Sequence, residues 1–319
     1  MKPEILLTGV NGQVGHELSV FLQQLGSLTS LTREQLDLSK PDEIRRMVRT
    51  VKPNLIVNPA AYTAVDKAES DEQTARDINA RAPEVFAEEA KRIGALLVHF
   101  STDYVFDGTK KSAYGEDDPT NPQNAYGRTK LEGERAIQGS GAAYLIFRTA
   151  WVYGPRGRNF LLTILRLATQ REELKIVNDQ VGAPTSSREI ARATAKILEG
   201  IFAGNHNPSP LPDMSGVYHM TASGETTWYE FATSILDRAA KADRALPWFA
   251  TATNKSPLIA RRVLPIPTKE YPTPALRPAY SVLSNAKLGR TFHLQLPHWQ
   301  SQLDSVFSHG PEFHSPGGV

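Results

Sequence analysis

Ile5-Leu6-Leu7-Thr8-Gly9-Val10-Asn11-Gly12-Gln13-Val14-Gly15 is the stretch that decides the fold of this chain. Its apolar start predicts a buried strand, and residues 13 to about 25 place apolar side chains on one face of a helix. Between the two elements stand glycines, which allow the backbone to turn sharply and to approach a ligand closely. A strand, a glycine turn and a helix favour a dinucleotide site, where the pyrophosphate binds N–H groups at the helix N-terminus. An ordinary tight turn is the alternative.

The end of the second predicted strand, residues 28–31, indicates which dinucleotide is bound. Thr32 and Arg33 follow this strand. In a nucleotide-binding unit this position faces the adenosine ribose, where an acid binds the 2′-hydroxyl and an arginine accommodates a 2′-phosphate. Arg33 therefore favours NADPH, with NADH as the alternative. The alternative is that Arg33 is a solvated arginine at a strand end and does not contact a cofactor.

Apolar strands and amphipathic helices alternate through the first half of the chain. Further strands are predicted at residues 55–58, 96–100 and 144–147, with helices between them. This alternation predicts an α/β fold, a Rossmann-like doubly wound parallel sheet. Serine or threonine followed three residues later by an acid marks helix starts at Ser39, Ser186 and Thr227 as capping boxes.

The pattern loosens beyond residue 150, where we expect a smaller, mixed α/β substrate-binding lobe. The expected NADP(H)-binding Rossmann domain covers residues 1–150 and is completed by segments near 174–200 and 216–222. The lobe is expected to comprise residues 151–173 and 223–309. A loop at 205–215 and a tail at 310–319 are rich in proline, glycine and polar residues, and are expected to be poorly ordered.

Tyr126 and Lys130 form the candidate catalytic pair. In a helix they stand one turn apart, so both side chains leave the same face. A phenol is a poor proton donor near neutral pH because its ordinary pKa is about 10, and a nearby ammonium lowers that pKa. Thr102, after the strand 96–100, is expected to direct its hydroxyl into the same site. A helix that carries tyrosine and lysine by chance is the alternative.

The composition excludes several classes of function. Among 319 residues, 36 are basic and 34 acidic, which gives a net charge of +2 and no footprint for nucleic acid or a membrane surface. The absence of cysteine excludes disulfides, thiol catalysis and cysteine-bound metals. No apolar stretch approaches the length of a membrane span or signal peptide, so a cytoplasmic monomer or homodimer is expected.

Several longer strings resemble a known family. The glycine turn and Tyr126–Lys130 resemble the extended short-chain dehydrogenase/reductase superfamily. Within it, the dTDP-4-dehydrorhamnose reductases are similar over a set of strings, namely NPAAYTAVDKAE (58–69), STDYVFDG (101–108), FRTAWVY (147–153), DQVGAPT (179–185) and YPTPALRP (271–278). The resemblance runs from Ile5 to about Gln300, and its last two strings lie outside the cofactor motif.

The resemblance implies that NADPH reduces the C4 ketone of dTDP-4-dehydro-6-deoxy-L-mannose to give dTDP-L-rhamnose. Tyr126 would donate the proton, Lys130 would lower its pKa and hold the nicotinamide ribose, and Thr102 would bind the substrate oxygen. Thr102, Asp103 and Trp151 match the family's substrate contacts, and Trp151 either stacks on the ligand or packs in the core. Besides Tyr126 and Lys130, the matching cofactor contacts are Gly9, Gly12, Gln13, Val14, Gly15, Thr32, Arg33, Asp37, Leu38, Ala61, Tyr62 and Thr63.

Magnesium is not predicted. Some family members bind it between subunits, and Glu17 and Glu189 match two of their carboxylates, but we find no matching third carboxylate near the C-terminus. Both glutamates have simpler explanations, because acids near a helix start are favoured by the helix dipole and by capping.

Two other functions are kept as alternatives. A non-catalytic regulatory subunit, resembling the beta subunit of methionine adenosyltransferase, would bind the nucleotide without turnover. An epimerase of the same superfamily would retain its cofactor and show no net oxidation. Thr102, Tyr126 and Lys130 are all present, which favours the reductase over the regulatory subunit.

Overall fold

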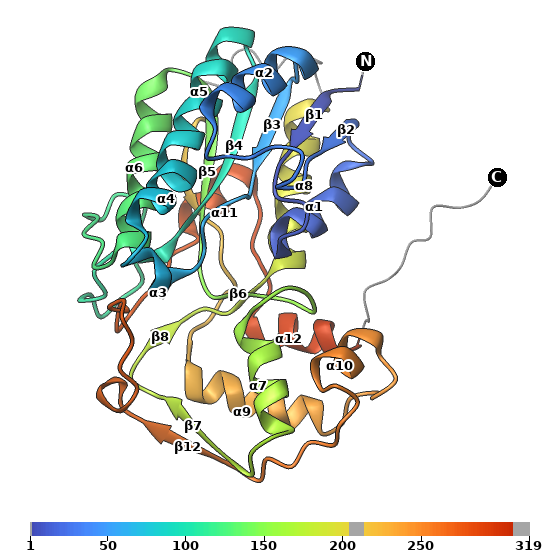
Figure 1. Ribbon diagram of the computed structural model, residues 1–319, viewed down its shortest axis with the longest axis vertical. Helices are drawn as coiled ribbons and strands as arrows, with labels where there is room; N and C mark the ends of the chain where they lie inside the picture. The colour runs from blue at the N-terminus through green and yellow to red at the C-terminus, as the bar shows by residue number, and fades with distance from the viewer. Residues whose placement is uncertain (1, 204–213, 309–319) are drawn as a thin grey trace, which may run out of the picture.

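The structure is a computed structural model in which residues 2–203 and 214–308 are described. The prediction for the tail 310–319 lies outside the described residues, as does nearly all of that for the loop 205–215. Figure 1 shows two parts, a larger one built around a sheet and a smaller one below it. We call them the sheet domain and the lobe.

A six-stranded parallel sheet forms the centre of the sheet domain. The strands lie in the order β10, β5, β4, β3, β1, β2. Their bounds are β1 (Glu4–Leu7), β2 (Ser27–Ser30), β3 (Leu55–Asn58), β4 (Leu96–Thr102), β5 (Ala143–Thr149) and β10 (Gly216–His219). The chain moves from β1 to β2 on one side and then crosses to β3 on the other. Sheets of this kind bind ligands beside such a reversal, at the carboxyl ends of the strands.

Helices cover both faces of the sheet (Figure 1). One face packs against α1 (Gln13–Leu22), α8 (Ser187–Phe202) and α11 (Ala286–Phe292), and the other against α2 (Pro41–Val51), α5 (Ala82–Ile93) and α6 (Ala125–Ser140). Alternate residues of each strand supply the two cores, so Ile5 and Leu7 face one set of helices and Leu6 faces the other. The predicted fold class is confirmed.

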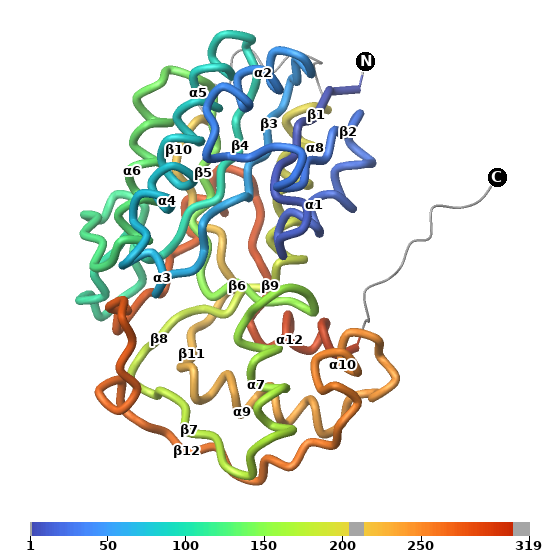
Figure 2. The backbone as a smooth tube through the Cα atoms, in the orientation of Figure 1, coloured from blue at the N-terminus to red at the C-terminus, as the bar shows by residue number. Residues whose placement is uncertain are grey.

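An aromatic core holds the lobe together, with buried rings that include Phe231, Trp248, Phe249 and Trp299. They come from α9 (Trp228–Ala239), α10 (Pro247–Ala252) and α12 (Trp299–Ser308), which pack with α7 (Phe160–Ala168). Short strands pair at its surface, β7 (Glu173–Val177) with β12 (Arg262–Ile266) and β8 (Val181–Gly182) with β11 (Thr226–Thr227). Figure 2 shows β7 and β12 side by side at the end of the lobe far from the sheet.

The sequence predicts that residues 174–177 help to complete the large sheet, and this is wrong. They belong to β7, which pairs in parallel with β12 along its whole length. Pro265 can stand in β12 because that strand lies at the edge of its sheet. A short apolar strand carries no local mark of its partner, so only the folded chain reveals the pairing.

Shorter elements lie within the sheet domain and at its junction with the lobe. After β3 come α3 (Val65–Ala68), α4 (Glu72–Arg76) and a π-helical turn (Asp77–Arg81) that runs into α5. At the junction of sheet domain and lobe, β6 (Val152–Tyr153) pairs in parallel with β9 (Thr185–Ser186).

Of the predicted capping boxes, that at Thr227 is confirmed at the start of α9. The other two are wrong. Ser39 donates to the Asp37 carboxylate in a local turn, and α2 begins one residue later than the box requires. Ser186 precedes α8 without a side-chain bond to its first turn, and Glu189 forms an ion pair along that helix instead. Serine side chains choose between local turns and caps, and the short pattern does not decide between them.

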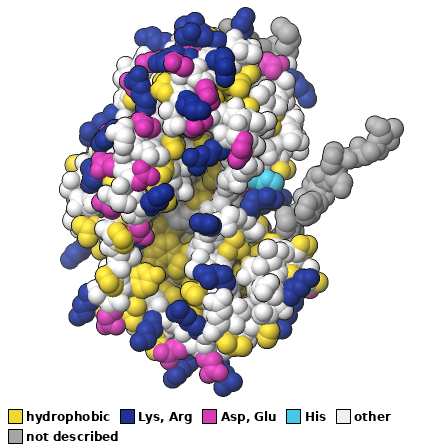
Figure 3. Space-filling model, in the orientation of Figure 1, with side chains coloured by type: hydrophobic (Ala, Val, Ile, Leu, Met, Phe, Trp, Pro, Cys, Tyr) yellow, Lys and Arg dark blue, Asp and Glu magenta, His cyan; other side chains and the backbone are white. Residues whose placement is uncertain are grey.

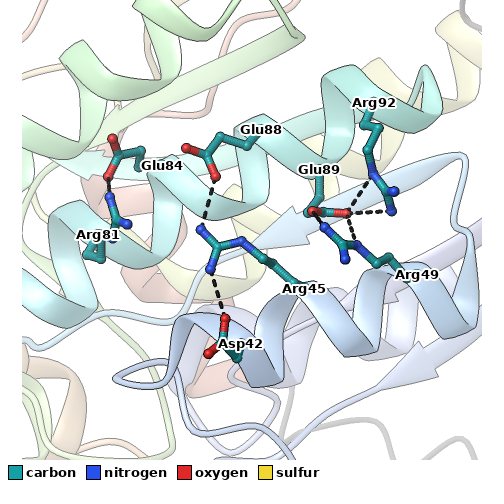
Figure 4. Close-up of polar contacts among 8 residues, drawn as sticks. All are labelled: Asp42, Arg45, Arg49, Arg81, Glu84, Glu88, Glu89 and Arg92. Atoms are coloured by element: carbon teal, nitrogen blue, oxygen red, sulfur yellow. Dashed lines mark hydrogen bonds and ion pairs between the residues drawn. The ribbon is translucent and has the colours of Figure 1, made fainter.

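Ion pairs join α2 to α5 on the outer face of the sheet domain (Figure 4). Arg45 lies 3.3 Å from Glu88, and Arg49 lies 2.7 Å from Glu89. The Arg45–Glu88 pair is solvent-accessible and contributes about 1 kcal/mol or less, whereas the Glu89 carboxylate of the second pair is buried. Apolar side chains beneath the two helices form the core of this layer. No helix in the described part of the chain is both long enough and apolar enough to cross a membrane.

Candidate active site

The glycine turn lies at the carboxyl end of β1, and α1 begins directly after it. Gly9 adopts a φ of 61°, and the Gly12 N–H donates to the Gly9 carbonyl at 2.9 Å. A Cβ on Gly15 would overlap that same carbonyl group, so the turn requires glycine there. No side chain caps α1, which leaves its first N–H groups directed at the site that a phosphate would occupy. The turn thus brings together the residues expected to hold the pyrophosphate, Gly9, Gly12, Gln13, Val14 and Gly15.

The other expected cofactor residues lie at the same edge of the sheet. Thr32, Arg33, Asp37 and Leu38 are in the loop after β2, and residues 61–63 are in the loop after β3. The Val10 N–H donates to the Leu31 carbonyl, and a Cβ on Gly9 would lie 2.9 Å from the Ala60 methyl. Both loops therefore contact the glycine turn. Arg33 is exposed and can reach a bound nucleotide.

Asn79 fixes the loop after β3, and the sequence reasoning misses it. Its buried amide accepts from the Tyr62 N–H at 2.8 Å and donates to the Tyr62 carbonyl at 3.1 Å. The same amide donates to the Thr129 hydroxyl of α6 at 3.2 Å. Asn79 lies in the π-helical turn, a feature frequent at functional sites that no simple sequence pattern reveals.

Tyr126 stands in the first turn of α6, beside the end of β4. The helix is capped by Asn124, whose side-chain oxygen accepts from the Gly127 N–H at 2.8 Å. The Thr102 hydroxyl lies close enough to the Tyr126 phenol to influence its pKa, and it donates to Asp103 at 3.0 Å. The structure therefore brings Tyr126, Thr102 and Asp103 together, as the sequence predicts.

Burial raises the pKa of the Tyr126 phenol to about 12, although the neighbouring Thr102 hydroxyl acts in the opposite direction. Burial is the largest influence on this pKa, and Lys130 is not among the groups that act on it here, so the expectation that Lys130 lowers it stays a prediction. At neutral pH Tyr126 therefore carries its proton. A protonated phenol is a proton donor, as the reduction of a ketone requires.

Lys130 is almost fully buried, and its nitrogen is held from the side of β4. It donates to the Phe100 carbonyl at 2.6 Å and lies 3.0 Å from Nε2 of His99. Burial lowers the pKa of Lys130 to about 8, against the influence of the Glu134 carboxylate. His99 is a second residue that the sequence reasoning misses. A polar residue inside an otherwise apolar strand was the signal, since such a residue needs a partner.

Asp103 is a buried carboxylate with one oxygen unused. Its Oδ1 accepts from Thr102, whereas Oδ2 has no hydrogen-bond partner among the described residues. Burial raises the pKa of Asp103 to about 6, although the nearby hydroxyls of Ser281 and Thr102 act in the opposite direction. A buried oxygen without a partner is costly, so this one fits a position where a ligand hydroxyl would donate.

Of the two roles expected for Trp151, this structure shows packing, and neither face of its indole is open to a ligand. The indole of Trp228 lies parallel to it, with 3.4 Å between ring centroids and an interplanar angle of 4°. Gly182 packs against the opposite face, where an added Cβ would overlap the ring. Both faces are therefore covered, and a ligand can meet only the edge of the Trp151 indole.

We expect Gly182→Ala to displace the Trp151 indole, because the new methyl group occupies the space of the ring. Overpacking of this kind costs about 1–3 kcal/mol of unfolding free energy. Tryptophan fluorescence and chemical denaturation measure the two effects. Gly200→Ala is the matched control, since nothing lies within 4 Å of a Cβ built there. Equal behaviour of the two variants would contradict the packing of Trp151 between Trp228 and Gly182.

Glu17 and Glu189 border a small cavity together with Arg188. Burial raises the pKa of Glu17, and Arg188 and Arg156 act in the opposite direction. Glu189 pairs with Arg192 at 2.5 Å. Within the described ranges, no three His, Asp or Glu side chains are grouped so that they could hold a metal ion. Arginine side chains thus neutralise both carboxylates in this structure.

The molecular surface is hollowed between the sheet domain and the lobe, and hydrophobic side chains gather in the hollow (Figure 3). The carboxyl edge of the sheet, with the glycine turn, Thr102 and Tyr126, faces the lobe. Concave sites lined by apolar side chains with a few polar groups are the usual sites for small ligands.

Comparison with known proteins gives a consistent result. Residues 1–310 match the family model described as the RmlD substrate binding domain. The dTDP-4-dehydrorhamnose reductase of Burkholderia thailandensis is 50% identical over 93% of this chain and 95% of its own length. That of Escherichia coli K12 is 44% identical over 93% of this chain and 94% of its own. A dTDP-4-dehydrorhamnose reductase of Bacillus anthracis, solved with NADP, is 32% identical with a TM-score of 0.84, and the match covers 97% of this chain and 99% of that one.

Proposed function

We propose the following function for this chain, which belongs to the family of dTDP-4-dehydrorhamnose reductases: NADPH-dependent reduction of the C4 ketone of dTDP-6-deoxy-L-lyxo-4-hexulose to dTDP-L-rhamnose. The observation that carries the proposal is the position of the Tyr126 phenol, which lies next to Thr102 and Asp103 at the nucleotide-binding edge of the sheet. No feature of the site favours the regulatory subunit.

NADPH, when bound, supplies the hydride to the carbonyl carbon. The glycine turn, Arg33 and the loops after β2 and β3 would hold the dinucleotide. Tyr126 donates its phenolic proton to the carbonyl oxygen, where negative charge develops during reduction. The Thr102 hydroxyl, which donates to Asp103 in this structure, would turn to donate to the same oxygen when the substrate is bound. Lys130 would hold the nicotinamide ribose with an N–H that is not used by Phe100 or His99.

The substrate would be oriented by groups on both sides of the hollow. The unused oxygen of Asp103 would accept a hydrogen bond from a sugar hydroxyl, and the edge of Trp151 would limit the space beside it. A buried polar group that only the correct ligand satisfies is a strong source of specificity. The cofactor would therefore bind to the sheet domain, and the sugar nucleotide would bind between the sheet domain and the lobe. We propose the domain division in this form, with β7 in the lobe.

The test is incubation of the protein with NADPH and the 4-keto sugar nucleotide, followed by the loss of NADPH absorbance and identification of dTDP-L-rhamnose. Stoichiometric oxidation with formation of this product is expected. Tight NADPH binding without turnover would instead support a regulatory subunit, and sugar conversion without net oxidation would support an epimerase.

Arg33→Asp is expected to shift cofactor preference from NADPH towards NADH. The exposed guanidinium is placed to pair with a 2′-phosphate, and a charge-assisted hydrogen bond of this kind contributes about 1.5–3 kcal/mol, or roughly 10- to 100-fold in affinity. Fluorescence titration with both reduced cofactors measures the shift. Arg46→Asp makes the same charge change on the exposed side of α2 and serves as control. NADPH affinity that is unchanged in Arg33→Asp would exclude the phosphate contact.

We also propose that the protein acts in the cytoplasm, because both substrates are charged nucleotides, which cross a lipid bilayer only at high cost. The oligomeric state expected from the sequence, a monomer or a homodimer, is part of the same proposal.

A further inference from the structure

A row of polar side chains crosses the sheet just below the nucleotide-binding loops. In the register of β1, β3 and β4, Leu6 lies beside Ile56, and Ile56 beside Leu97, on the face covered by α5 and α6. Two residues further along each strand, on the same face, stand Thr8, Asn58 and His99. We call these three residues the polar row.

The polar row is buried and hydrogen bonded from end to end. The Thr8 hydroxyl donates to Asn58 Oδ1 at 2.6 Å, and Asn58 Nδ2 lies 3.3 Å from His99 Nδ1. The other ring nitrogen, Nε2, lies 3.0 Å from the nitrogen of Lys130. Each of the three side chains has at most 2% of its surface exposed. The mechanism proposed above uses the lysine but leaves the row unexplained.

The donors and acceptors of the polar row allow two hydrogen-bonding arrangements. As placed, the Asn58 amide donates to Nδ1 of His99, so the ring proton lies on Nε2 and faces an uncharged Lys130 amine. If the Asn58 amide is flipped, its Oδ1 faces the ring and accepts from Nδ1, so the ring proton lies on Nδ1. Nε2 then accepts a hydrogen bond from a charged Lys130 ammonium. Burial and the lysine charge keep the pKa of His99 well below its ordinary value, which keeps the ring neutral in both arrangements.

We propose that His99 is a positioning residue for the reduction, holding the Lys130 nitrogen at a fixed point one turn of α6 from Tyr126, whether the lysine is charged or neutral. Asn58 and Thr8 fix the ring in turn. Because Thr8 directly precedes Gly9, and Asn58 ends β3, the row also ties the lysine to the loops of the nucleotide site. The inference rests on the proposed function, since the reaction gives Lys130 its role.

Two substitutions separate this role from simple packing. The amide of a glutamine reaches the position of the histidine Nε2 and can meet Lys130, whereas that of an asparagine reaches only the position of Nδ1. We expect His99→Gln to keep kcat within about 5-fold of the wild type, and His99→Asn to lower kcat by roughly 10- to 100-fold, as the loss of a hydrogen bond to a charged group would. NADPH affinity, measured by fluorescence titration, is expected to stay within about 3-fold in both. Equal kcat values in the two variants would overturn the proposal.

A second measurement needs no variant at residue 99 and no turnover. In protein labelled with nitrogen-15 at histidine, the ring nitrogens of His99 report their hydrogen bonds. Lys130→Met removes the partner of Nε2, so we expect the Nε2 signal to shift while other histidine signals stay in place. An unchanged His99 signal would overturn the proposal. If the wild-type protein does not reduce the keto-sugar, the proposed function has failed. The nitrogen-15 measurement would still decide whether His99 holds Lys130.

Discussion

Replacement of Tyr126 by phenylalanine is expected to lower kcat by about 10²- to 10⁴-fold, the usual contribution of a general acid. The substitution removes only the phenolic oxygen, and burial raises the pKa of that phenol to about 12, so the lost group is a proton donor held in its protonated form. Hydride transfer to the carbonyl carbon would then leave an alkoxide with the Thr102 hydroxyl as its remaining neighbour. Stopped-flow or steady-state NADPH oxidation measures the effect.

The control for this variant is Tyr144→Phe. Tyr144 lies beside Leu97 near the start of β5, whereas Thr102 pairs with Thr149 at the other end of the same two strands. Tyr144→Phe makes the same chemical change far from the carboxyl edge of the sheet. Because Tyr144 contacts nothing in the site, we expect kcat of this variant to stay within about 2-fold of the wild type. NADPH should bind to both variants. A Tyr126→Phe protein with undiminished kcat would remove the phenol from the mechanism.

The fold could be predicted from the sequence because its determinants are local. The apolar run before Gly9, the glycines of the turn and the period of the following helix are each visible within a few residues. Parallel strands end at one edge, so residues placed after strands, such as Thr102 and Arg33, could be assigned to one site without knowledge of their contacts. Tyr126 and Lys130 could be assigned to one helix face by spacing alone.

What the sequence did not reveal depends on contacts between distant segments. The contact between His99 and Lys130 joins two elements that are far apart in the sequence. The pKa of the Tyr126 phenol depends mainly on burial, which only the folded chain reveals. Gly182 belongs to a string that resembles the family, but the string does not show that this glycine makes room for Trp151. The same holds for β7, whose partner β12 is distant in the sequence. It also holds for Ser39, where the short sequence pattern does not decide between a helix cap and a local turn.

One ion pair of the sheet domain is buried, so that removal of one partner alone would be costly. Arg148 of β5 meets Glu134 of α6 with three N–H···O contacts of 2.7 to 3.2 Å, and neither side chain has more than 4% of its surface exposed. The guanidinium also lies 5.1 Å from the centroid of the Phe106 ring, while its Nη1 has no hydrogen-bond partner among the described residues. Glu134 is therefore the principal group that compensates the buried charge of Arg148.

Glu134→Ala is expected to lower the free energy of unfolding by about 3–5 kcal/mol, because it leaves the Arg148 charge buried without a counter-ion. The matched control is Glu132→Ala, two residues earlier on the same helix. Glu132 also meets an arginine through two contacts, at 2.8 and 3.3 Å to Arg76, but both side chains are about 40% exposed. Water replaces that partner, so a loss of about 1 kcal/mol or less is expected there.

Chemical denaturation followed by circular dichroism measures both losses on one scale. The double variant Glu134→Leu with Arg148→Met removes both charges and leaves apolar side chains in the space, so it should recover much of the stability lost in Glu134→Ala. Equal losses for Glu134→Ala and Glu132→Ala would mean that water reaches Arg148 in solution. Together the three variants test the cause of the stability loss. They show whether it follows from leaving a buried charge without a counter-ion or from the number of hydrogen bonds removed.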